Sequence, residues 1–152
     1  MSVEQTPTEL TLGRLLFLAH RAVHDQLDRR LHEHGASLWN WVLLREAANA
    51  NGASQRELAE LMRIEPPTLV RHLDKLAEDG LVERQPDPDD RRVVRVIVTK
   101  SGRKRLAQLH EVVHEVDAEL RQALPAREVD VLRKALTRIH EHFTEEVASG
   151  RS

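Results

Sequence analysis

The chain has 152 residues, of which 40% are hydrophobic and 32% charged, and this composition suits one helix-rich globular domain. It contains no cysteine, which excludes disulfides, thiolate metal sites and thiol-based sensing of oxidants. No apolar run reaches the length of a membrane span, and residues 1–11 lack the basic-then-apolar pattern of a signal peptide. We therefore expect a cytoplasmic protein without a membrane partner.

The net charge of -2 is unevenly distributed along the chain. Between Arg84 and Arg105 there are eight basic and three acidic residues, so this segment carries +5 and the remainder -7. A local basic segment can neutralise the phosphates of a polyanion even on an acidic chain. The alternative is a solvated charge run without a partner, and the charge alone does not decide between the two.

Apolar residues at helical spacing predict a first helix over residues 9–34 and a second over residues 37–49. Gly35 is placed to end the first helix, and the turn-rich run Asn49-Ala50-Asn51-Gly52 to end the second.

A capping box is predicted to open the third helix. The Ser54 hydroxyl can accept a hydrogen bond from the Glu57 amide, while the Glu57 carboxylate accepts one from the Ser54 amide. After a tight break at residues 63–65, Pro66-Pro67 can start a fourth helix, because amides in the first turn lack intrahelical partners. That helix is predicted to reach about Asp79. The apolar positions expected to face inward are Leu58, Ala59, Leu61, Leu69, Val70, Leu73, Leu76 and Ala77. Two short helices joined by a tight turn are typical of a helix-turn-helix.

Two short β-rich runs, residues 81–84 and 93–98, flank a segment at 86–90 whose prolines and aspartates fit neither a helix nor a strand interior. This pattern predicts a β-hairpin with an exposed tip. Two long helices follow, over residues 99–123 and after Pro125, each with a narrow apolar seam.

The predicted fold is mainly α with a small β-hairpin, in one continuous domain. A winged helix-turn-helix at residues 35–99 is flanked by an N-terminal dimerisation helix at 1–34 and C-terminal dimerisation helices at 100–152. The seams of these helices have little to bury against within one chain, so we expect a homodimer. The alternative is that the seams pack within a single chain.

On these motifs, the sequence resembles the MarR family of bacterial transcription regulators. The family's wing signature is Asp, any residue, Arg, five residues, then Leu-Thr; here it is Asp90-Arg91-Arg92, five residues, then Val98-Thr99, with Val in place of Leu. Residues 64–74 and 80–85 resemble the SlyA branch, and the resemblance covers nearly the whole chain. It implies a sequence-specific regulator of double-stranded DNA, namely a ligand-responsive repressor that acts as a homodimer on a pseudo-palindromic operator.

The candidate DNA-binding residues lie in the helix-turn-helix and at the hairpin tip. Arg71, on the outer face of the fourth helix, is predicted to contact a guanine edge in the major groove. Arg92 is predicted to enter the minor groove, with Asp90 orienting it rather than touching DNA. Contacts to phosphates and thymine methyl groups are predicted for Ser54, Gln55, Pro66, Pro67, Thr68, Arg91 and Arg95.

The resemblance also implies a site for a small aromatic acid, in place of a resident cofactor. The matching residues, whose rings and charges suit such a ligand, are His20, His24, Trp39, Arg45 and His110. The alternative is that the tryptophans fill the core and the histidines are merely exposed.

A zinc-responsive regulator of the same fold is another alternative, because His110 and His114 lie one turn apart on one helix. Relatives that sense zinc also need ligands from the first two helices, and here residues 37–41 offer neither histidine nor acid.

Other classes of function fit the sequence less well. An enzyme is not expected, because the sequence has no nucleophile elbow, glycine-rich phosphate loop or paired-carboxylate motif. A helical protein-interaction adaptor with an incidental basic hairpin is the remaining alternative.

Overall fold

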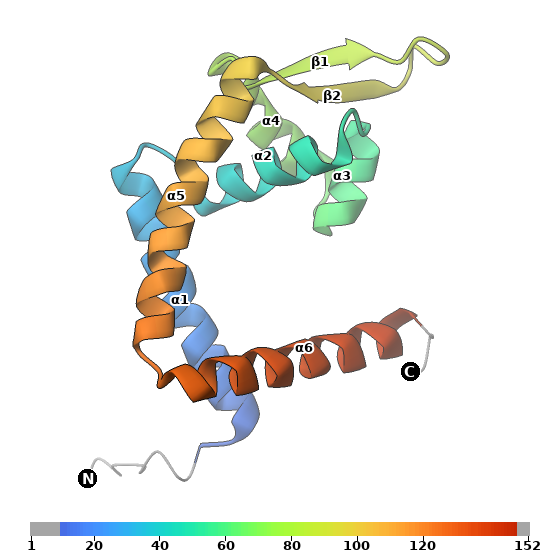
Figure 1. The fold of residues 1–152 in the computed structure, drawn as a ribbon. Coiled ribbons are helices and arrows are strands. Elements are labelled where there is room, and N and C mark those ends of the chain that lie inside the picture. The colour runs from blue at the N-terminus through green and yellow to red at the C-terminus, as the bar shows by residue number, and fades with distance from the viewer. Residues whose placement is uncertain (1–9, 149–152) are drawn as a thin grey trace, which may run out of the picture. The chain divides into compact units, whose positions relative to one another are not determined.

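The computed structural model describes residues 10–148, with side chains placed up to residue 145. The elements in chain order are α1 (Leu12–Glu33), α2 (Leu38–Ala50), α3 (Gln55–Met62), α4 (Pro66–Glu78), β1 (Val82–Pro86), β2 (Val94–Val98), α5 (Lys100–Gln122) and α6 (Ala126–Ala148) (Figure 1). This order confirms the predicted fold class, mainly α with one hairpin. The predicted start of the first helix, Glu9, lies outside the described residues.

The chain divides into two compact units, Met1–Val113 and His114–Ser152. The first contains α1 to α4, the hairpin and the beginning of α5; the second contains the end of α5 and α6. The three segments expected from the sequence, which end at residues 34, 99 and 152, divide the chain by role into dimerisation and DNA-binding parts. That division stays a prediction. None of the described helices is both long enough and apolar enough to cross a membrane.

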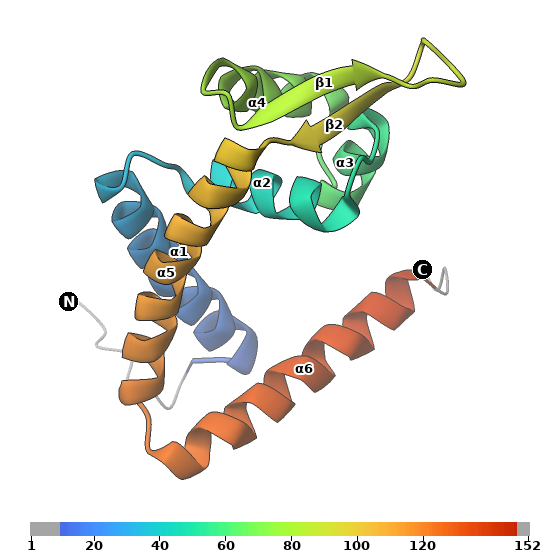
Figure 2. The same ribbon diagram turned by 45° about the horizontal axis from the view of Figure 1, so that its top comes forward.

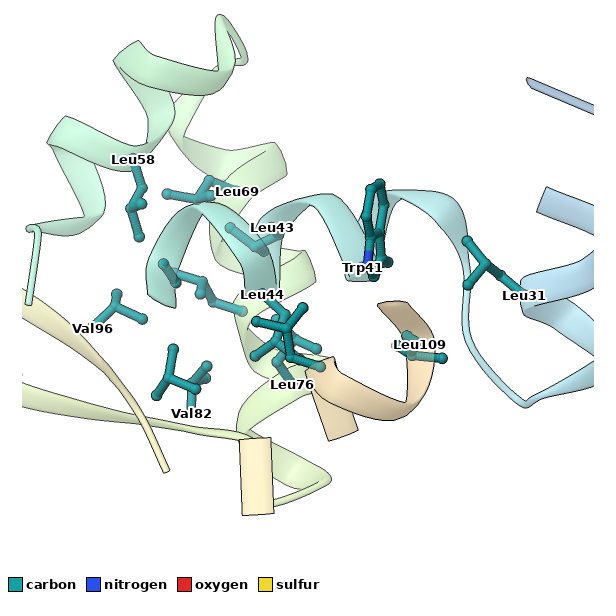
Figure 3. Packing of buried hydrophobic residues seen from close by; sticks show 14 of the residues in the cluster. Leu31, Trp41, Leu43, Leu44, Leu58, Leu69, Leu76, Val82, Val96 and Leu109 are labelled. Atoms are coloured by element: carbon teal, nitrogen blue, oxygen red, sulfur yellow. The ribbon is translucent and has the colours of Figure 1, made fainter. Parts of the chain in front are cut away.

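The core of the first unit is built from leucines of α2, α3 and α4 together with valines of the hairpin. Leu43, Leu58 and Leu69 are almost completely buried where these helices meet, and Figure 3 shows Val82 and Val96 on the hairpin side of this cluster. Burial of such side chains stabilises the fold by about 1.5–3 kcal/mol each. The core therefore fixes α4 and the hairpin to the same helical base.

Two residues expected inside are exposed. Leu61 is 56% exposed and Val70 is 37% exposed. The helical step of 100° per residue explains both, because α3 buries Leu58 and Ala59, and α4 buries the line through Leu69 and Leu73, so that neither Leu61 nor Val70 falls on the buried stripe. The apolar pattern therefore predicted the position of the buried face of each helix correctly, but it overestimated the width of that face.

The antiparallel hairpin pairs Val82 with Val98 and Pro86 with Val94. Strand β1 thus extends two residues beyond its predicted end; proline is tolerated there because β1 is an edge strand of a two-stranded sheet. We use "wing" for β1, β2 and the loop between them, residues 82–98. The wing loop projects beyond the helices of the first unit (Figures 1 and 2).

The beginning of α5 is fixed tightly to the end of the helix-turn-helix. The Thr99 hydroxyl donates to the Gly80 carbonyl (2.7 Å) and accepts from the Gly102 amide (2.9 Å). A Cβ atom at Gly102 would lie 2.0 Å from the Leu81 carbonyl oxygen. Residue 102 must therefore be glycine for α5 to approach the Leu81 backbone this closely.

Candidate nucleic-acid interface

The turn between α3 and α4 follows from local sequence. The predicted capping box is present, with the Glu57 amide 3.1 Å from the Ser54 hydroxyl and the Ser54 amide 2.7 Å from the Glu57 carboxylate. Hydrogen bonds from Ser54, the backbone amide first, hold the pKa of Glu57 below its usual range. Arg63 ends α3 in the left-handed conformation (φ 53°), and α4 begins at Pro66.

Helix α4 presents an open polar face. Leu69, Leu73 and Leu76 are buried, whereas Arg71 is exposed on the opposite side, as predicted. At the N-terminus of α4 both prolines are exposed and Thr68 is partly exposed. The side chains predicted to meet DNA from this helix are therefore accessible.

The wing arginine Arg92 is held as predicted. Its Nε and one terminal nitrogen lie 3.1 and 3.2 Å from the two carboxylate oxygens of Asp90, and its own amide donates to the same carboxylate (3.0 Å). These bonds, the side-chain bond first, lower the pKa of Asp90. The Arg92 side chain is nevertheless 91% exposed. An oriented cation thus stands at the wing tip, next to the exposed Arg91.

A groove of about 450 Å³ lies between α3, α4 and the wing. Its lining includes four of the predicted DNA-binding residues, Ser54, Gln55, Pro66 and Arg92. Ser54 itself is buried, and its hydroxyl and amide serve the capping box, so this residue is largely committed to the structure of α3. Gln55 is half-buried at the first position of α3.

Arg95 makes two contacts within the protein while its side chain remains 42% exposed, and the predicted phosphate contact stays a prediction. Its Nε bonds the Asp87 carboxylate, and a terminal nitrogen donates to the Gly52 carbonyl at 2.8 Å. Residue 95 also bridges to Ser54 through the backbone. The partner carboxylate, that of Asp87 on the wing loop, is itself buried.

Arg84 was missed by the sequence analysis. Its two terminal nitrogens reach the Asp74 carboxylate (2.6 Å) and the Val70 carbonyl (3.1 Å), so strand β1 holds helix α4 by two bonds. The contact joins residues ten and fourteen positions apart, and no local motif marks it. The sequence offered only a basic residue in the middle of β1 and an acid in the second half of α4.

The residues predicted to bind a small aromatic acid contact different partners within this chain. Trp39 stacks on His72 of α4, with ring centroids 5.8 Å apart, whereas Arg45 lies over Trp41 at 4.7 Å. Trp39 and Trp41 are two positions apart on α2 and therefore point to different sides of this helix, and the ligand site stays a prediction. Of the remaining residues, His110 lies at the edge of Trp41 and His20 faces His24 on α1.

Arg45 and His110 both contact the ring of Trp41. Trp41 is buried, and its indole N–H has no hydrogen-bond partner within the described residues.

The described residues contain no group of three or more His, Asp or Glu side chains that could hold a metal ion. This includes the surroundings of His110 and His114.

Comparison with known proteins gives a consistent result. Residues 37–94 match the family model described as MarR family. Wild-type MarR from E. coli in its apo form superposes with a TM-score of 0.79 at 29% identity, over 86% of this chain and 96% of that one. A mutant MarR from E. coli complexed with operator DNA has a TM-score of 0.74 at 29% identity, over 84% and 92%. The transcriptional repressor CouR bound to a 23-mer DNA duplex has a TM-score of 0.82 at 25% identity, over 92% and 99%.

Proposed function

We propose that this chain, which belongs to the MarR family, regulates transcription by sequence-specific binding to double-stranded DNA in the cytoplasm. Helix α4 enters the major groove, where Arg71 contacts a base edge, and the wing tip enters the adjacent minor groove with Arg92. The finer resemblance to the SlyA branch stays a prediction.

The observation that carries this proposal is the pair of exposed arginines on two elements that face one groove. Arg71 extends from α4, Arg92 is aimed by Asp90 at the wing tip, and the cavity between α3, α4 and the wing is open. Two structural neighbours, MarR from E. coli and CouR, were solved with duplex DNA, which supports the same kind of partner for this chain.

We further propose a homodimer acting as a repressor on a pseudo-palindromic operator. Helix α1 exposes Leu12, Leu15, Phe17 and Leu18. Within the second unit, Leu120, Leu132 and Leu136 line an apolar groove of about 220 Å³ while remaining 40–42% exposed. Monomeric proteins seldom expose so many large apolar side chains, and a second copy of the chain would bury them. The name of CouR, a transcriptional repressor, supports repression as the output.

Regulation by a small aromatic acid remains part of the proposal, with a revised site. The unpartnered Trp41 N–H, the Arg45 guanidinium and the nearby His110 ring offer a donor, a cation and an aromatic edge to such a ligand. Trp39 is left out of this set because it stacks on His72.

The proposal is tested by selecting bound duplexes from a random-sequence DNA pool and measuring the affinity of variants for the enriched sequence. Arg71→Ala should flatten the base preference at one position per half-site, at a cost of about 1–3 kcal/mol. Arg92→Ala should weaken binding about tenfold at every sequence. Arg127→Ala is the matched control, since this arginine of α6 is 86% exposed. Wild-type affinity for both interface variants would contradict the proposal.

A further inference from the structure

The wing loop is organised around one buried carboxylate that no DNA contact requires. The side chain of Asp87 is only 8% exposed, although five of the other six residues of its loop, 87–93, are charged or proline. One oxygen accepts the amides of Asp89 (2.8 Å) and Asp90 (3.1 Å), and the other accepts Arg95. A buried carboxylate is costly unless such partners satisfy it.

These bonds connect the helix-turn-helix to the wing tip. Arg95 donates to the Gly52 carbonyl before α3, and beside it the Val96 amide donates to the Ala53 carbonyl (3.0 Å). The Asp87 carboxylate accepts hydrogen bonds from Arg95 and from the Asp90 amide. The Asp90 carboxylate in turn accepts hydrogen bonds from the guanidinium of Arg92. A continuous series of hydrogen bonds, made by Arg95, Asp87 and Asp90, therefore connects Gly52 with Arg92.

We propose that Asp87 and Arg95 are positioning residues for the DNA contact of Arg92: they fix the place from which the wing arginine enters the minor groove. The inference rests on the proposed function, because it specifies how that site is held. Asp87 is buried and acts through Asp90 and Arg92; Arg95, whose side chain is 42% exposed, acts on Arg92 through Asp87.

Electrostatics makes this inference easy to distinguish from a bulk charge effect. Asp87 is an anion close to a surface that meets phosphates, so neutralising it should strengthen binding if only the net charge mattered. If Asp87 positions Arg92, neutralising it should weaken binding instead. The two expectations have opposite signs.

Asp87→Asn is the most direct variant. The side chain keeps its size, but one acceptor oxygen becomes an NH₂ donor that opposes the Arg95 N–H group. Asp89→Asn is the matched control, because it makes the same charge change in the same loop at an exposed residue. With the duplex enriched by the wild-type chain as probe, we expect Asp87→Asn to bind about five- to tenfold more weakly, and Asp89→Asn to bind equally well or more tightly.

A double-mutant cycle with Arg92→Ala decides whether the effect passes through Arg92. The loss caused by Asp87→Asn should disappear in the Arg92→Ala background, whereas a general structural defect would persist there. Arg95→Lys, which keeps the charge but cannot serve both Asp87 and the Gly52 carbonyl, replaces Asp87→Asn in the cycle if circular dichroism shows that variant to be unfolded. Additive losses, or no loss for Asp87→Asn and Arg95→Lys, would overturn the inference. Wild-type affinity for Arg92→Ala alone would remove the minor-groove contact on which the inference rests, whereas wild-type affinity for both Arg92→Ala and Arg71→Ala would overturn the proposed function.

Discussion

Three neighbouring wing arginines have different surroundings. Arg92 is oriented outward by an acid two residues before it, Arg91 is exposed, and the partly exposed Arg95 is bound by Asp87 and a backbone carbonyl. The Asp90–Arg92 contact could be predicted from the sequence because it is local. The roles of Arg95 and Arg84 could not, because their partners are brought near only by the hairpin register and by the packing of α4 on β1.

The acids around the wing make its stability depend on pH. The amide of Asp89, then Arg95, then the amide of Asp90 lower the pKa of Asp87, and Arg92 lowers that of Asp90. A carboxyl group whose pKa is depressed by folding stabilises the fold above its unfolded pKa of about 4 and loses that contribution as the pH falls through the lower, folded value. We expect the Tm of the wild-type chain to fall more steeply below about pH 4 than the Tm of Asp87→Asn. Equal slopes in thermal melts followed by circular dichroism would show that this carboxylate contributes nothing.

The Arg84 contacts should matter for the stability of the fold. Arg84→Ala removes two bonds between β1 and α4, and we expect the free energy of unfolding to fall by roughly 1–2 kcal/mol. Urea denaturation measures this loss. Arg56→Ala is the comparison, because Arg56 makes an ion pair with Glu60 on the exposed face of α3 and should change stability by less than about 0.5 kcal/mol. An Arg84→Ala variant as stable as Arg56→Ala would contradict the structural role.

At the scale of elements, strong local signals gave reliable predictions. The capping box at Ser54, the proline start of α4 and the helix-ending Gly35 each act through the backbone of a few neighbouring residues. The width of a buried face was less predictable, as Leu61 and Val70 show, because it depends on which helices pack against it. The need for glycine at residue 102 also depends on tertiary packing, since the obstructing atom belongs to Leu81.

Gly102→Ala tests the junction between the helix-turn-helix and α5. The added Cβ would collide with the Leu81 carbonyl, and because that obstacle is backbone, we expect a loss of about 1–3 kcal/mol in the free energy of unfolding. Gly13→Ala in α1 is the control, because a Cβ there meets no atom within 4 Å. It should leave stability unchanged or raise it by up to about 1 kcal/mol, as alanine favours helix. Equal stabilities of the two variants in urea denaturation would show that the junction tolerates a side chain.

At the scale of the whole molecule, the sequence predicted the order of helices and hairpin but not the division of the chain after Val113. That division falls inside one long helix, α5, where no glycine, proline or turn signal marks it. The seams of the long helices were visible as periodic apolar residues, and several of them are exposed in the isolated chain. They lead to the proposal of a dimer.

The dimer is tested by sedimentation equilibrium at micromolar concentration. The wild-type chain should sediment as a dimer, and Leu136→Glu, which places a charge in the apolar groove of the second unit, should shift it toward the monomer. Thr137→Glu adds the same charge at the next, exposed position and should remain dimeric. A monomeric wild-type chain would contradict the dimer proposal.

The most direct test of the central claim is DNA cleavage from the wing tip. Because the chain has no cysteine, Arg91→Cys creates a single site for attaching an iron–EDTA group, and Arg127→Cys on α6 provides the control. With the enriched duplex, the wing-tip probe should cut in two narrow clusters in the minor groove, placed symmetrically about the centre of the operator and flanking the major grooves occupied by α4. Cleavage that is absent, or that is as diffuse as cleavage from residue 127, would contradict the account.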